Sequence, residues 1–126
     1  MMTTPNLPSE LTFRDGLVGF PGLHQFTVRT ADGPVVELVS IEEPEFGLLV
    51  TLGELVRPGL GALLAERDLV APAEDVLVVL SIHGDPPGVT ANLAGPIVFA
   101  PDGGARQLVV EDPSLPLRSP VATTAR

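Results

Sequence analysis

The sequence predicts a mainly β protein, a small antiparallel β-barrel-like domain with one short helix. With 14 Pro and 13 Gly in 126 residues, turns are too frequent for a helical bundle. Between the turns, short apolar runs alternate with polar residues, as half-buried strands do. Hydrophobic residues make up 44% of the chain but aromatic residues only 4%, so the core must be aliphatic, built around five Phe.

Seven or eight short strands are expected, each bounded by turn residues. The clearest segments are residues 10–14, 24–30, 35–41, 46–52, 76–82, 97–99 and 106–111. Asn92, Gly95 and Pro96 predict a turn just before the strand at 97–99. The best-marked hairpin joins 97–99 to 108–110 through Asp102-Gly103-Gly104.

One helix is expected at residues 58–67. Pro58 can occupy a first helical position without losing a hydrogen bond. Leu60, Leu63 and Leu64 recur at the spacing of one helical face. The helix should be short and should cover one end of the sheet.

The length fits a single domain, placed at residues 10–112. Residues 1–9 are expected to form a flexible N-terminus, and residues 113–126 a C-terminal tail outside the core. The first ten residues lack the basic and apolar regions of a secretory signal. No apolar run approaches the ~18 residues needed to span a bilayer. We therefore expect a cytoplasmic protein without a membrane partner.

The charge is strongly acidic, with 16 Asp and Glu against seven Arg and a formal net charge of −9. Nucleic-acid binding depends on Lys and Arg that neutralise phosphates, so direct binding of nucleic acid is not expected. An acidic surface can attract a basic protein, although it can also serve only solubility.

No catalytic constellation is found in the sequence. There is no Cys and no Gly-x-Ser-x-Gly motif, and His24 and His83 have no partner at metal-ligand spacing. The glycines of residues 16–22 do not have the dinucleotide-binding spacing. The sequence thus predicts no enzyme, no metal and no cofactor; an enzyme that uses carboxylates would need two acidic side chains converging in a pocket.

Two acidic groups stand out, although charge runs are usually solvated. They are Glu42, Glu43 and Glu45 in one group and Glu111 with Asp112 in the other. A metal or acid–base role for the first group is disfavoured because adjacent residues at a strand end point to opposite sides.

Two motifs, Gly16-Leu17-Val18-Gly19-Phe20 and residues 90–98, resemble those of the FliW family of flagellar assembly factors. The first is similar to the family's Gly-Leu-Pro-Gly-Phe, with Val18 in place of proline. Residues 90–98 resemble its Thr-Ala-Asn-Leu…Ala-Pro-Ile-Val block, with Gly95 in place of alanine. Residues 43–46, 107–110 and 116–120 fit further segments of the family in the same order.

The resemblance implies a compact β-barrel-like regulator that binds flagellin and, when flagellin is scarce, binds the translational repressor CsrA. CsrA would then release flagellin messenger RNA. We expect the acidic positions to contribute to the CsrA-facing surface: Glu42, Glu43, Glu45, Glu111 and Asp112. A small β-barrel interaction protein unrelated to flagella remains the alternative.

Two further residues have two interpretations each. Asn92 could contact a partner, but a turn residue whose side chain bonds its own backbone is favoured. Phe20 could be an exposed anchor for a flagellin helix, but packing back onto the core is favoured.

Overall fold

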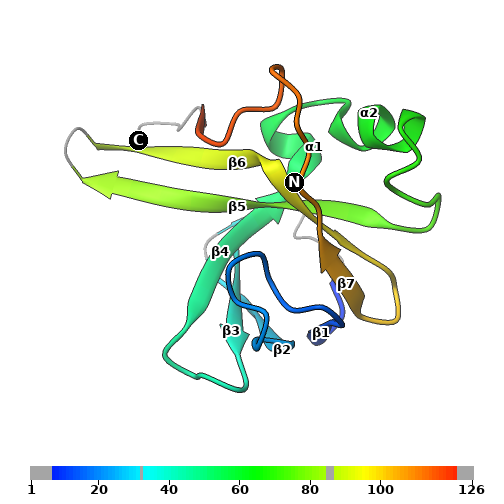
Figure 1. Cartoon of the computed structure of the whole chain (residues 1–126). Coiled ribbons are helices and arrows are strands. Elements are labelled where there is room, and N and C mark those ends of the chain that lie inside the picture. The colour runs from blue at the N-terminus through cyan, green and yellow to red at the C-terminus, as the bar shows by residue number, and fades with distance from the viewer. Residues whose placement is uncertain (1–6, 32, 85–86, 122–126) are drawn as a thin grey trace.

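The computed structural model describes residues 7–31, 33–84 and 87–121, which form a closed β-barrel with two short helices on its outside (Figure 1). The strands close the barrel in the order β5-β4-β3-β2-β1-β7-β6, with β6 pairing back to β5 and β8 added to β6. The mainly β, barrel-like prediction is confirmed. The strands are β1 (Glu10–Phe13), β2 (Gln25–Thr30), β3 (Val36–Ser40), β4 (Gly47–Leu52), β5 (Asp75–Gly84), β6 (Pro87–Phe99), β7 (Gly104–Gln107) and β8 (Ser119–Pro120).

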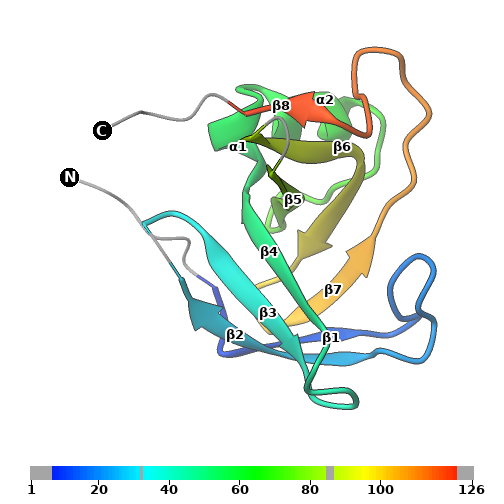
Figure 2. The same ribbon diagram turned by 90° about the vertical axis from the view of Figure 1, so that its left-hand side faces the viewer.

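The pairings are antiparallel except for one. β1 pairs with β7 in parallel, with Thr12 opposite Gly104 and Phe13 opposite Ala105. A ring of seven strands cannot alternate direction at every step, because the number is odd, so one pair must run parallel. The ring is visible in Figure 2, where β1 lies between β2 and β7.

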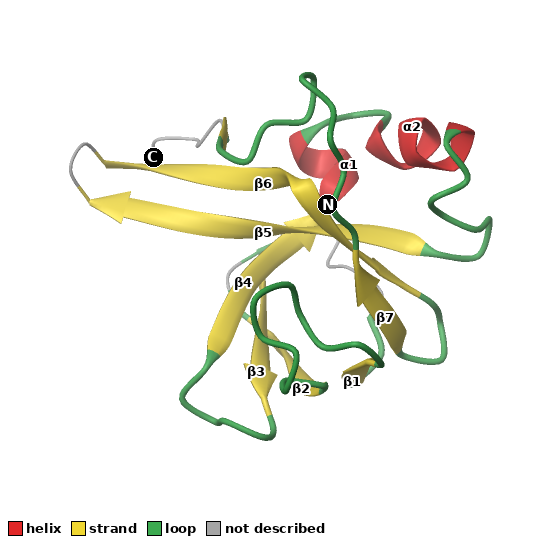
Figure 3. Ribbon diagram, in the orientation of Figure 1, coloured by secondary structure: helices red, strands yellow, loops and turns green. Residues whose placement is uncertain are grey.

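The long strands β5 and β6 form a hairpin that extends well beyond the barrel (Figure 3). Their register shifts between Leu77, opposite Ile97, and Val79, opposite Asn92. β6 therefore contains a bulge between residues 92 and 97, and the same strand continues on both sides of it. The predicted turn before residue 97 is wrong in this respect, because a bulge accommodates Gly95 and Pro96 without reversing the chain.

The core consists of two layers separated by β5 and β6. Leu77, Ile97 and Phe99 face the barrel interior with the buried side chains of β1–β4. Val76 and Val98, on the opposite face, pack in a second cluster under the helices. Alternation along a strand places neighbouring residues on opposite faces, so a strand that separates two clusters is apolar on both.

The second cluster includes Leu115, which is buried, and β8 pairs with β6 through Ser119 and Pro120. The expectation that residues 113–126 lie outside the core is therefore wrong for this part of the segment. Short, proline-rich stretches carry no periodic signal, so the burial of Leu115 could not be predicted from residue spacing. Residues 1–6 and 122–126, from the expected termini, lie outside the described residues.

The predicted helix is confirmed as α2 (Leu60–Glu66), with Leu60 and Leu64 fully buried and Leu63 packed against them. The expectation that Pro58 takes the first helical position is wrong, because the helix begins at Leu60 and Gly59, at a φ of 89°, is its N-cap. A further short helix, α1 (Gly53–Val56), was not predicted. The Glu54 carboxylate of α1 accepts the backbone N–H groups of Gly59 and Gly61, which ties the two helices together.

A hairpin follows β6 where the sequence predicted one, but residues 97–99 pair with 105–107 and not with the predicted 108–110, with Val98 opposite Arg106. β6 begins at Pro87, well before the predicted strand at 97–99, and β7 ends at Gln107. Beyond it, the N–H groups of Leu108 and Val110 donate to the carbonyl oxygens of Pro96 and Ala94. This segment thus follows the bulged part of β6.

Candidate partner-binding surface

The connection between β1 and β2 contains a tight turn at residues 17–20. Leu17 and Phe20 exchange backbone hydrogen bonds of 3.1 and 2.8 Å, with Val18 and Gly19 at the tip. Gly19 has a φ of 85°, which the third residue of a type II turn requires. The turn exposes Val18 and Phe20.

Phe20 lies at the outer end of a row of aromatic rings. Its ring centroid is 4.7 Å from that of Phe46. The Phe46 centroid is 6.3 Å from that of Phe26, which in turn is 5.4 Å from that of Phe13. The Phe20 side chain nevertheless remains 48% exposed. The ring therefore packs against Phe46, as the favoured interpretation expects, but about half of its surface stays accessible.

Gln107 joins the turn to the bulge of β6. Its side-chain Oε1 accepts the N–H of Val18 at 2.9 Å, and its Nε2 donates to the carbonyl of Gly95 at 3.0 Å. The sequence did not single out this role, because a glutamine in a strand carries no periodic or motif signal of its own. Gln107 positions the two segments whose motifs carried the family resemblance.

Asn92 stabilises the bulge through its own backbone. Its Oδ1 accepts the N–H groups of Ala94 at 3.0 Å and Gly95 at 2.9 Å. This agrees with the favoured interpretation of a local hydrogen-bonding residue. A Cβ at position 95 would lie 2.9 Å from Asn92 Nδ2 and 3.1 Å from Gln107 Nε2, so the space left by the glycine admits both amides.

The connection between β3 and β4, which we call the acidic loop (residues 41–46), holds Glu42, Glu43 and Glu45. The Glu42 carboxylate accepts the N–H groups of His24 at 3.2 Å and Gln25 at 3.1 Å. Partial desolvation acts to raise the pKa of Glu42, but backbone hydrogen bonds outweigh it and hold that pKa below its usual value. Glu42 thus fixes the loop against the start of β2, while Glu43 and Glu45 are exposed.

Asp112 is also engaged within the chain. It forms an ion pair with Arg67, at the end of α2, and accepts the N–H and hydroxyl of Ser114, both at 2.8 Å. The Ser114 hydrogen bonds, with that of Arg67, lower the pKa of Asp112 to about 2. Its neighbour Glu111 is exposed.

The acidic positions do not form one surface. The acidic loop lies at the bottom of the molecule in Figure 1, and the segment with Glu111 and Asp112 lies at the top, next to the helices. The view in Figure 2 separates them in the same way. Of the candidate residues, only the acidic loop and Phe20 are brought together, through the contact of Phe20 with Phe46.

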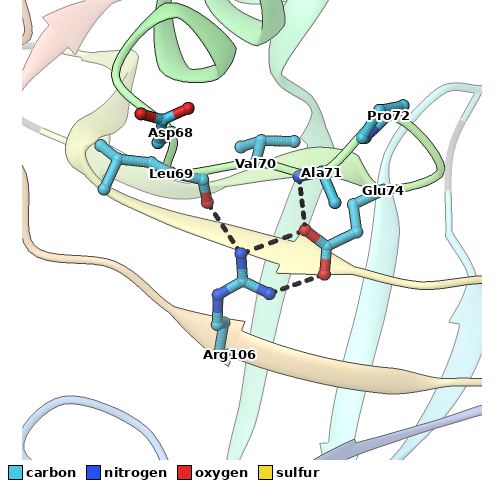
Figure 4. Close-up of a pocket in the computed structure, with 7 residues that line it drawn as sticks. All are labelled: Asp68, Leu69, Val70, Ala71, Pro72, Glu74 and Arg106. Carbon is cyan, nitrogen blue, oxygen red and sulfur yellow. Dashed lines mark hydrogen bonds and ion pairs between the residues drawn. The ribbon is translucent and has the colours of Figure 1, made fainter.

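A shallow hollow lies beside β5, between the connection after α2 and β7 (Figure 4). Arg106 of β7 binds both carboxylate oxygens of Glu74, at 2.6 and 3.1 Å, and the carbonyl of Leu69 at 2.7 Å. The hydrogen bonds that Arg106 donates to Glu74 lower the pKa of that carboxyl, and the same hydrogen bonds raise the pKa of Arg106. The terminal nitrogens of Arg106 thus bind the connection after α2 and hold it against β7.

The histidines serve local contacts. His24 Nδ1 lies 2.9 Å from the carbonyl oxygen of Phe13, and His83 Nε2 lies 2.9 Å from Thr90 Oγ1 across the β5–β6 hairpin. Within the described residues, no three His, Asp or Glu side chains gather in a group that could hold a metal ion. Among the residues that the structure describes, no helix is long and apolar enough to cross a membrane.

These features define a small closed β-barrel protein whose exposed aromatic and acidic side chains sit on neighbouring loops. The FliW protein family profile matches residues 3–121. A flagellar assembly factor FliW of Bdellovibrio bacteriovorus is 36% identical over 124 residues, covering 90% of this chain and 70% of that protein. Another, from Syntrophotalea carbinolica, is 33% identical over 121 residues, covering 86% and 84%.

The crystal structure of a flagellar assembly factor FliW has the same fold, with a TM-score of 0.70, 20% identity and coverage of 91% of this chain and 86% of that one. The chain belongs to the FliW family of flagellar assembly factors. The family resemblance in the sequence is confirmed, and it favours a flagellar role over an unrelated β-barrel interaction protein.

Proposed function

We propose that this protein acts in the cytoplasm as a regulatory binding protein that holds flagellin and, when flagellin is scarce, sequesters CsrA and so relieves repression of flagellin synthesis. The observation that carries the proposal is membership of the FliW family over nearly the whole chain. Binding without catalysis is in keeping with a surface of exposed apolar and acidic side chains.

For flagellin, the proposed anchor is Phe20. A ring that already packs against Phe46 and is half exposed loses little conformational freedom on binding, and aromatic anchors often dominate interface energies. An apolar face of a flagellin helix could cover the exposed face of the ring.

The test compares Phe20→Ala with Leu55→Ala, which removes an apolar side chain that is 57% exposed on α1. Both proteins would be titrated with purified flagellin, and both would be unfolded with denaturant. We expect Phe20→Ala to weaken flagellin binding by at least about tenfold, a loss of about 1.4 kcal/mol. Unchanged flagellin binding with a loss of stability would assign Phe20 to the core alone.

For CsrA, we propose that the exposed carboxylates Glu43 and Glu45 of the acidic loop face the partner, while Glu111, at the opposite end of the molecule, adds to the negative charge that attracts it. The Glu42 carboxylate accepts the N–H of Gln25, and Asp112 forms an ion pair with Arg67. Glu42 and Asp112 therefore contribute by holding the segments that carry the exposed charges. Opposite charges accelerate encounter and fix orientation more than they add affinity.

The test is a double charge reversal, Glu43→Lys with Glu45→Lys, against a control with the same charge change, Glu10→Lys with Glu66→Lys, both of which are exposed. Association rates with CsrA would be measured at low and high salt. We expect the acidic-loop variant to associate more slowly and with a weaker salt dependence than the control. Equal rates and equal salt dependence in the two variants would remove the acidic loop from the interface.

A further inference from the structure

The hairpin of β5 and β6 leaves part of a strand edge open. β4 pairs with β5 from Leu77 to Leu80, where Leu80 lies opposite Leu49. β5 continues to Gly84, paired only with β6 on its other side. Within the described residues, the edge of Ser81–Gly84 that faces away from β6 therefore has no neighbouring strand.

The direction of the backbone groups on this edge follows from the partner strand. The carbonyl of Val89 accepts the N–H of Val121, on the side of β6 that faces away from β5. Val89 is opposite Ile82, so this pair does not exchange hydrogen bonds across the hairpin. The N–H and C=O of Ile82 consequently point to the open edge, as do those of Gly84, two residues further.

This edge lacks the features that usually protect an exposed strand from pairing. Residues 81–84 contain no proline and no Lys, Arg, Asp or Glu, and the Ile82 side chain is 68% exposed. Open edges of this kind are templates for an added strand, in which main-chain hydrogen bonds supply affinity.

The charge around the edge selects the kind of partner. Glu37 of β3 lies opposite Leu49 of β4, which in turn lies opposite Leu80 of β5, and the Glu37 carboxylate lies beside Gly47 at the start of β4. Arg29 pairs with Glu37 from β2, one strand further from the edge. A second copy of this chain, with a net charge of −9, would be repelled, whereas a basic segment would be attracted.

We propose that the open edge of β5 at Ile82 and Gly84 binds an extended, basic segment of a protein partner by β-strand addition. The added strand hydrogen-bonds to the two outward-facing residues, places apolar side chains against Ile82 and directs its cationic side chains toward Glu37. This site is separate from Phe20 and does not depend on the identity of the partners proposed above.

The probe is a capped peptide of alternating lysine and valine, with a peptide of alternating glutamate and valine as its control. Amide hydrogen exchange of the protein would be followed residue by residue by NMR. We expect the lysine peptide to slow exchange at Ile82 and Gly84 by at least about tenfold, while exchange at Leu77, inside the barrel, does not change. The glutamate peptide should have no effect.

Two variants separate backbone pairing from side-chain contact. Ile82→Pro removes the outward N–H, at an edge position where proline is tolerated, and Ile82→Ala removes the side chain but keeps the N–H. We expect Ile82→Pro to abolish peptide binding and Ile82→Ala to weaken it only in part.

Three results would overturn the proposal. The first is no slowing of exchange at Ile82 in the wild-type protein with the lysine peptide. The second is equal loss of binding in the two variants. The third is slowing that depends on protein concentration without peptide, which would identify a second copy of the chain as the occupant.

Discussion

The side chain of Gln107 accepts the backbone N–H of Val18 across 89 residues of sequence, at 2.9 Å, while its amide nitrogen holds Gly95. Gln107→Ala would leave the Val18 N–H and the Gly95 carbonyl without this partner. Since the Gly95 contact is partly buried, we expect the free energy of unfolding to fall by about 1–2 kcal/mol. Denaturant unfolding measures the change.

The same variant should loosen the turn that carries Phe20, so amide exchange at Val18 should become faster. Gln25→Ala is the matched control, because Gln25 is exposed on β2. If Gln107→Ala and Gln25→Ala were equally stable, and amide exchange at Val18 did not change, the hydrogen bonds of Gln107 to Val18 and Gly95 would have no energetic role.

The turn also depends on Gly16, which we expect to tolerate no side chain. Gly16 has a φ of 74°, and a Cβ there would lie 2.5 Å from the carbonyl oxygen of Pro21. Gly19 has a φ of 85° but open space around the corresponding position. Gly19→Ala should cost only the left-handed backbone penalty, about 1–2 kcal/mol, and Gly16→Ala clearly more, by about 1–3 kcal/mol, because backbone atoms must move.

Thermal or denaturant unfolding of the two glycine variants provides the measurement. Equal destabilisation would show that the Pro21 backbone gives way without cost, in contradiction to the contact distances.

The sequence was sufficient to predict the barrel because its strands follow local rules. Alternation in residues 24–30 acts over a few positions, so β2 was predicted within one residue of its bounds. The turn residues Asp102 and Gly103 located the β6–β7 hairpin, although its second strand is 104–107 and not 108–110. The Leu60 and Leu64 face of α2 was predicted for the same reason.

The missing features depend on contacts between distant residues. The pairing of Arg67 with Asp112 and the bridge from Gln107 to Val18 join segments that no local pattern relates. For this reason the sequence could single out the five acidic candidates but could not predict their positions on the surface. Two of them, Glu42 and Asp112, bind groups of their own chain. The bulge at Asn92 was read as a turn because both use the same residue types.

The connection after α2 should depend on the geometry of Arg106 as well as on its charge. Arg106→Lys keeps the positive charge but cannot span both oxygens of Glu74 and the Leu69 carbonyl. Because the Arg106 side chain is 45% exposed, we expect a loss of stability of only about 1 kcal/mol. Limited proteolysis should show faster cleavage within residues 68–74.

Arg29→Lys is the control for this change, since Arg29 is an exposed arginine on β2. Cleavage of residues 68–74 at the same rate in the Arg106 and Arg29 variants would show that charge alone is sufficient.

Asp112 should make the stability of the protein sensitive to acid. Hydrogen bonds from Ser114 and the ion pair with Arg67 lower the pKa of Asp112 from 3.8 to about 2 in the folded state. A carboxyl with a lower pKa when folded contributes its stabilisation fully above its unfolded value, and loses it as the pH falls through the folded value. The contribution should therefore disappear between about pH 4 and about pH 2.

Asp112→Asn removes the titrating group while keeping a similar shape, so its stability should fall less steeply over this range than that of the wild type. Unfolding by denaturant at about pH 5 and about pH 2.5 measures both slopes. Glu111→Gln is the control, because the adjacent carboxylate is exposed, and it should leave the slope as it is in the wild type. A wild-type slope that Asp112→Asn did not reduce would mean that acid acts elsewhere, with Glu42 and Glu74 the next carboxyls to test because their pKa values are also lowered.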